Sequence, residues 1–156
     1  MSQLVSMDVM LRSLDLAVTE TLETMFFADA LPAPLAGLPS GGISSVVRFE
    51  GDATGLLELR VSESSAKELA ASFLGIDPPE VDRIQIESVC GEMANMICGA
   101  MVSIAAPEGR FALSPPQVLE PGEAAPVCSI IRTYEMESEC LEVGLSCSFT
   151  DYSREH

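Results

Sequence analysis

The chain has 156 residues and a formal net charge of −16, from 24 acidic and 8 basic side chains. A surface this acidic repels phosphate backbones and anionic lipids, so we expect neither a nucleic acid nor a membrane as partner. Hydrophobic residues make up 47% of the chain, which indicates a folded protein and not an acidic disordered one. The length fits a single domain over residues 1–156 with a core of its own.

The cysteines and the lone histidine do not form a metal-binding pattern. None of the five cysteines belongs to a CxxC pair, and the only histidine is His156 at the chain end, so a zinc site lacks its ligands. An odd number of cysteines without a signal-peptide pattern is typical of reduced thiols. No stretch approaches ~18 consecutive apolar residues. We therefore expect a soluble, cytoplasmic protein without a cofactor or metal of its own.

The first predicted element is a helix over residues 7–27. Its apolar side chains recur at three- and four-residue spacing, which places them on one side of a helix. They are Met7, Met10, Leu11, Leu14, Val18, Leu22, Met25 and Phe26. A loop is predicted over residues 32–42, because three prolines precede Gly41-Gly42 there.

Two strands are predicted next, over residues 43–50 and 56–61. The glycine-rich segment 51–55 between them is typical of a hairpin turn.

A second predicted helix begins at Ser62 or Ser65. Glu68 follows Ser65 by three residues and completes a capping-box pattern with it. Gly75 ends this helix, since glycine is the usual residue after a helix C-terminus.

A long central helix is predicted from residues 77–80 to about residue 105, with Pro107 ending it. Extended segments follow it, over residues 111–113, 117–120, 127–136 and 140–149. Helices grouped beside antiparallel strands, without βαβ alternation, indicate an α+β fold in which helices pack on an antiparallel sheet. The strand over residues 140–149 would tend to pair with a second copy if it were a sheet edge, but an internal position is an equal alternative.

The central helix has two different faces over residues 88–101. At 100° per residue its buried side would be formed by Ile86, Cys90, Met93, Ile97, Met101 and Ile104. The opposite side would present Ser88, Glu92, Asn95, Gly99 and Ser103. Asn95 is the only asparagine in the chain and lies three residues after Glu92, so both side chains reach the same region of space.

Two glycines lie in this helix, at positions 91 and 99. Each costs roughly 0.5–1 kcal/mol of helix stability relative to alanine. Tight packing within the fold is one explanation for their presence. Close approach of an outside partner to the helix backbone is the other.

The pattern from Ser88 through Glu92 to Asn95, continued by Met96-Ile97-Cys98-Gly99, resembles the active-site helix of the CheC and CheX chemotaxis phosphatases, and is closest to CheX. A family proline follows some twenty residues later, near Pro115-Pro116 here. CheC-type members carry a second Glu-x-x-Asn on the first helix. Residues 7–27 contain no asparagine, so we expect a single site, as in CheX-like members.

The resemblance implies a fold, a reaction and partners. The fold would be CheC-like, and the substrate would be the aspartyl phosphate of a CheY-like response-regulator receiver domain. Asn95 would orient the attacking water and Glu92 would pair with the receiver's active-site lysine. Ser88, Met96 and Gly99 would contact that partner. Magnesium would belong to the receiver, and the protein would be a homodimer.

Two alternatives remain at this stage. The same fold could be a non-catalytic module that binds a receiver domain or a flagellar-switch partner. A metal- or nucleophile-based hydrolase is the other, with Cys90 or Cys98 as the candidate nucleophile. Cys90 falls on the apolar side and no internal histidine is available as a base, which argues against this second alternative.

Overall fold

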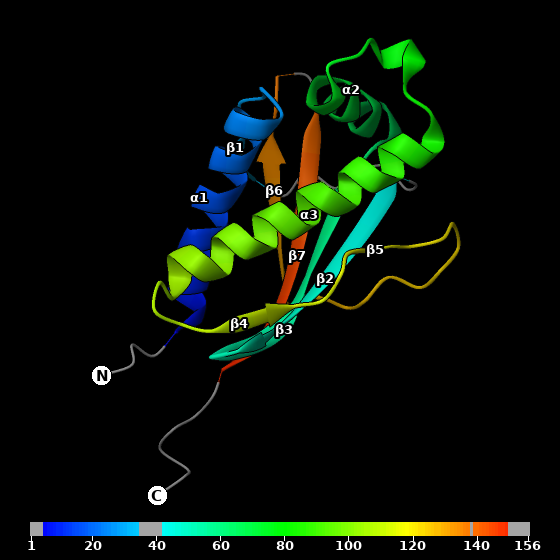
Figure 1. Ribbon diagram of the computed structural model, residues 1–156. Helices are drawn as coiled ribbons and strands as arrows, with labels where there is room; N and C mark the ends of the chain where they lie inside the picture. Colours follow the sequence, from blue (N-terminus) through cyan, green and yellow to red (C-terminus); the bar gives the residue numbers. More distant parts are fainter. Residues whose placement is uncertain (1–4, 35–41, 138, 150–156) are drawn as a thin grey trace, which may run out of the picture.

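The computed structural model describes residues 5–34, 42–137 and 139–149, in which helices pack on an antiparallel sheet (Figure 1). The helices are α1 (Met7–Met25), α2 (Glu63–Leu74), the 3₁₀ turn η1 (Pro78–Glu80) and α3 (Arg83–Ala105). The strands are β1 (Leu31–Ala33), β2 (Ile43–Gly51), β3 (Ala53–Val61), β4 (Phe111–Leu113), β5 (Gln117–Val118), β6 (Ile130–Glu135) and β7 (Cys140–Phe149). The predicted α+β class is confirmed. His156 and part of the loop predicted over residues 32–42 lie outside the described residues.

The sheet has the strand order β1-β6-β7-β3-β2-β4, and β5 also pairs with β2. Two hairpins, β2–β3 and β6–β7, lie side by side, joined by the long antiparallel pairing of β3 with β7. The strand β7 is therefore internal. The alternative of an exposed edge at residues 140–149 is wrong, because both sides of that strand are already paired within the chain.

One face of the sheet carries the core. Leu57, Leu59 and Val61 of β3 are fully buried and stand opposite Leu145, Val143 and Leu141 of β7. The helices cover this face, with α3 lying diagonally across the strands between α1 and α2 (Figure 1). Apolar side chains at alternate strand positions meet the apolar side of α3, which fixes the helix on the sheet.

The β2–β3 hairpin is tighter than predicted. Residues 53–55 belong to strand β3 and not to a five-residue turn, because they pair with Cys147–Phe149 of β7. A side chain at Gly55 would lie 1.9 Å from the carbonyl oxygen of Ser146. The glycine that suggested a turn is instead required by the close approach of the neighbouring strand.

Strand β1 was predicted as loop. Its residues pair with Thr133–Glu135 of β6 at the edge of the sheet. Proline is tolerated on an edge strand because its missing N–H can face solvent, so Pro32 does not prevent this pairing. The partner strand lies about a hundred residues further along the chain, which is why local sequence patterns do not reveal it.

Two helix boundaries differ from the predictions, the end of α1 and the start of α3. Helix α1 ends at Met25, and Phe27, two residues later, has a left-handed φ of 56°. Helix α2 is capped by Ser62, whose side chain accepts from the Ser65 amide, so the Ser65 capping box is wrong. Gly75 ends this helix in a left-handed conformation, as predicted.

Helix α3 begins later than predicted. Residues 78–80 form the separate 3₁₀ turn, and Asp82 caps α3 through a capping box with Gln85. Val81 and Asp82 have extended backbone conformations between the two elements, which separates this turn from α3. The later strands are also shorter than predicted, with β5 ending at Val118 and β6 beginning at Ile130.

Candidate functional site

The buried side of α3 anchors the helix in the core. Of the six residues predicted there, Ile104 is half-buried and the other five are buried. Val89, Ala94, Cys98, Val102 and Ala105 are buried as well, because α1 packs along one flank of α3 while the sheet lies beneath it. A helix fixed on this many sides can present its remaining face with little freedom to rotate.

The outward side of α3 carries the five residues predicted there, which form a stripe along the helix. Ser88, Glu92 and Ser103 are exposed, and Asn95 and Gly99 are half-buried. Glu92 and Asn95 are separated by three residues in unbroken α-helix, which makes them neighbours on its surface. Neither side chain forms a hydrogen bond or an ion pair within the described part of the chain. Both can therefore interact with a group outside the protein.

The segment that contains Pro115 and Pro116 borders the same face. Strands β4 and β5 both pair with β2, which brings the residues between them alongside α3. A methyl group on buried Gly91 would lie 3.4 Å from Pro116 Cβ and 3.8 Å from Val118 Cγ2. These are ordinary van der Waals distances, so a side chain at Gly91 would face another segment of the same chain and not the outward side of the helix.

Packing does not account for Gly99. A methyl group there would meet only Leu113 Cδ2, at 3.8 Å, which is an ordinary van der Waals contact. The fold has room for alanine at this position, and alanine is the better helix residue. Approach of an outside partner remains the explanation that fits Gly99.

Met96 differs from the other predicted contact residues. Its side chain is half-buried and packs against the hydrophobic core. Only part of Met96 is available to a partner, and the rest helps to hold α3 in place.

The structure adds Ile84 to the outward stripe. Ile84 lies one helical turn before Ser88 and is 79% exposed, the largest exposed fraction among the apolar residues of α3. Beside it, the Arg83 guanidinium donates to Glu87 and to Glu63 of α2. Ile84 was not among the predicted residues, because the outward side was predicted to begin at Ser88. Continuing the four-residue spacing backwards by one turn would have found it.

The thiols of α3 are not available as nucleophiles. Cys90 is 1% exposed and Cys98 is fully buried. Burial raises the pKa of each thiol to about 12, so the reactive thiolate is scarce at neutral pH. The cysteine-hydrolase alternative is not supported. Among the described residues, no group of three or more histidine, cysteine or acidic side chains could hold a metal ion.

Helix α3 is also the one described helix long and apolar enough to cross a membrane. Its apolar side chains lie in the core between α1 and the sheet. Burial within the fold accounts for the composition of this helix.

One protein family matches more than half of the chain. Residues 43–129 match the family described as "Chemotaxis phosphatase CheX", a segment that contains all of α3 and the Pro115-Pro116 pair. A search of curated protein sequences found no match.

Solved structures with a similar fold include chemotaxis proteins. CheX from Vibrio vulnificus has a TM-score of 0.75 and 19% identity, covering 94% of this chain and 100% of that one. CheX from Desulfovibrio desulfuricans has a TM-score of 0.72 and 19% identity, covering 89% and 99%. The CheX–CheY–BeF3–Mg complex from Borrelia burgdorferi has a TM-score of 0.68 and 17% identity, covering 93% and 99%. The expected CheC-like fold is confirmed.

Proposed function

Because the chain belongs to the CheX family of chemotaxis phosphatases, we propose that it hydrolyses the aspartyl phosphate of a CheY-like receiver domain. The observation that carries this proposal is the pair Glu92 and Asn95, held side by side on the outward face of a buried helix with no partner in the described part of the chain. A similar fold occurs in the CheX component of a complex with CheY, which supports the choice of partner.

Asn95 orients the attacking water. An aspartyl phosphate is a reactive acyl phosphate, so much of its catalysis can consist of placing a water in line with the leaving oxygen. The carboxamide can both donate a hydrogen bond to that water and accept one from it, and it carries no charge that would repel the phosphoryl group. Since Asn95 projects from a rigid helix, the water is placed without a large ordering cost.

Glu92 fixes the position of the receiver. A carboxylate that faces the receiver's active-site lysine makes a charge-assisted hydrogen bond. This contact sets the register of the two proteins and places Asn95 at the phosphoryl group. Ser88, Gly99 and the exposed part of Met96 form the surrounding contact surface, and the small side chains allow the receiver to approach the helix.

The protein supplies no cofactor in this scheme. The magnesium ion belongs to the receiver, where it neutralises the phosphoryl oxygens. We further propose that the protein acts in the cytoplasm as a homodimer. Light scattering on the purified protein tests the homodimer.

The direct test measures the decay of phosphorylated receiver domains from the same genome, labelled with a small-molecule phosphodonor. We expect the protein to shorten the phosphate lifetime, and Asn95→Ala to restore the spontaneous decay rate. Ser103→Ala is the matched control, because Ser103 lies on the same stripe two turns further along and is expected to leave the rate unchanged.

Two results would contradict the proposal. If the wild-type protein accelerates no receiver, it is not a phosphatase of this kind. Tight receiver binding without acceleration would instead support the non-catalytic binding module.

A further inference from the structure

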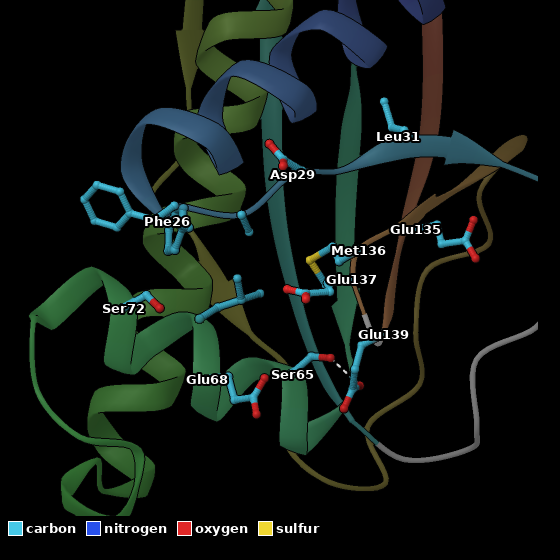
Figure 2. A pocket seen from close by; sticks show the side chains of 13 residues that line it. Phe26, Asp29, Leu31, Ser65, Glu68, Ser72, Glu135, Met136, Glu137 and Glu139 are labelled. Atoms are coloured by element: carbon cyan, nitrogen blue, oxygen red, sulfur yellow. Dashed lines mark hydrogen bonds between the residues drawn. The ribbon is translucent and has the colours of Figure 1, made fainter.

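A groove lined by both apolar and acidic side chains lies at a separate place in the fold. Its cavity of about 770 Å³ is formed by the C-terminal end of α1, by helix α2 and by the β6–β7 connection (Figure 2). No residue of α3 lines it. The Glu92–Asn95 pair therefore does not contribute to this groove, and the proposed phosphatase reaction does not use it.

Two large apolar side chains of the groove are exposed. Phe27 is 79% exposed and Leu31 is 66% exposed, while Leu69 and Met136 supply further apolar surface that is more deeply placed. Removing the apolar surface of such side chains from water lowers the free energy. Contact with an apolar group of a partner would therefore be favourable here.

The backbone at Phe27 would suit glycine better than phenylalanine. Phe27 has a φ of 56°, in the left-handed region that bulky residues rarely adopt. It ends α1 at the position where helices commonly have a left-handed glycine, and the amides of Phe26 and Ala28 both donate to the Leu22 carbonyl. An aromatic ring that is 79% exposed in this conformation buries little apolar surface within the fold, which is consistent with a role in binding.

All charged side chains that line the groove are acidic. Its carboxylates, which we call the rim, come from Asp29, Glu68, Glu135, Glu137 and Glu139, and no lysine, arginine or histidine is among the lining residues. Glu139 accepts from the hydroxyls of Ser62, Ser64 and Ser65, which lowers the pKa of its carboxyl and keeps it ionised. Within the described residues the other four make no hydrogen bond or ion pair. Their mutual repulsion would be relieved by a cationic partner.

We propose that this groove binds a short basic segment of another protein, in which an apolar side chain packs against Phe27 and Leu31 while lysine or arginine side chains meet the rim. The charge of the groove determines this choice. A second copy of the chain would bring its own net charge of −16 to an acidic surface, and a nucleic acid would bring phosphates. A basic amphipathic peptide complements both the apolar floor and the rim.

The experiment uses the full chain and a fluorescein-labelled peptide of about ten alternating lysines and leucines, with binding measured by fluorescence anisotropy. A lysine–serine peptide of the same charge tests the apolar contact. We expect Phe27→Gly to weaken binding of the lysine–leucine peptide about tenfold, by loss of the apolar contact. Its folding is expected to be intact, since glycine is favoured at this φ.

Charge reversal tests the rim. The double variant Glu68→Lys/Glu137→Lys is expected to weaken binding about tenfold. The matched control is Glu50→Lys/Glu108→Lys, which changes the net charge equally at exposed positions outside the groove and is expected to have little effect.

Four results would overturn the proposal. These are no binding of the lysine–leucine peptide, equally tight binding of the lysine–serine peptide, or equal weakening by the two double variants. The fourth is a change of oligomeric state in Phe27→Gly, measured by light scattering, which would assign the groove to a second copy.

Discussion

Pro116 packs against Gly91 on the flank of α3, while Gly99, two turns further along the helix, has only Leu113 near the place where a side chain would stand. The two glycines carry the same helix-propensity cost in different surroundings. Substitution of Gly91 therefore tests packing within the fold, and substitution of Gly99 tests the access of a partner to the helix.

Replacing Gly99 by alanine is expected to stabilise the protein by about 0.5–1 kcal/mol, because alanine is the better helix residue and the fold has room for its methyl. In the proposed phosphatase reaction the methyl would enter the space between the helix and the receiver, so we expect activity to fall. Urea unfolding and the receiver-dephosphorylation assay measure the two effects.

Gly91→Ala is the matched control for this prediction. Its methyl would face Pro116 and Val118 at van der Waals distance and not the receiver. We expect this variant to keep its activity. Equal loss of activity in both variants would show that the helix itself, and not the space at Gly99, had been disturbed.

Ile84 is expected to contribute receiver affinity without taking part in the chemistry. Ile84→Ser removes an exposed apolar contact one turn before Ser88, so we expect KM to rise about three- to tenfold with kcat unchanged. Steady-state kinetics with phosphorylated receiver separate the two parameters. An unchanged KM would place Ile84 outside the interface.

The sequence predicts the candidate site better than it predicts the sheet around it. The two faces of α3 follow from periodicity, so Glu92 and Asn95 could be placed outward before the fold was known. Strand β1 could not be found in this way, because its pairing with β6 depends on residues far along the chain. Gly55 was misassigned for the same reason, since only the presence of β7 distinguishes a close strand contact from a turn.

The acidic groove, too, could not be predicted from the sequence. Glu139 is 74 residues from Ser65, and the hydrogen bond between them exists only because the β6–β7 connection reaches the start of α2. No local pattern in the sequence links these residues. Features formed by one element were predictable, whereas features formed by several distant elements required the structure.

The cysteines of α3 are expected to be inert in the folded protein. Because burial raises the pKa of Cys90 and of Cys98 to about 12, iodoacetamide at neutral pH should modify them only after unfolding. Mass spectrometry of peptides from native and urea-treated protein checks this. Rapid native modification of either residue would show that the helix opens more readily than its packing indicates.

Glu139 is expected to make stability depend on pH. Hydrogen bonds from Ser65, Ser62 and Ser64 lower the pKa of its carboxyl in the folded state below the ordinary value of 4.5. The carboxyl therefore binds a proton more readily in the unfolded state than in the folded state. The stabilisation is fully present above pH 4.5 and is lost as the pH falls through the lowered pKa of the folded state. Glu139→Gln should lower Tm at neutral pH, with the difference from wild type shrinking at acidic pH.

Glu137→Gln provides the control for this pH dependence. Glu137 is exposed on the same connection and has no hydrogen-bond partner among the described residues. Its variant should show a much smaller Tm difference at neutral pH. If Glu139→Gln lowered Tm equally at neutral and acidic pH, the effect would come from packing and not from the charge of Glu139.

Tyr134 and Asp15 connect the sheet to α1, and breaking this contact is expected to destabilise the fold. The Tyr134 hydroxyl donates to Asp15 Oδ1 at 2.6 Å, and the tyrosine residue is fully buried. A hydrogen bond to a charged group contributes about 1.5–3 kcal/mol, so Tyr134→Phe should lower the free energy of unfolding by that amount. Asp15 also lies 3.6 Å from Arg132 Nη2, so Asp15→Asn alone affects two contacts. A double-mutant cycle measured by urea denaturation isolates the coupling free energy between Tyr134 and Asp15. Additive effects of the two substitutions would show that the hydrogen bond contributes no net stability.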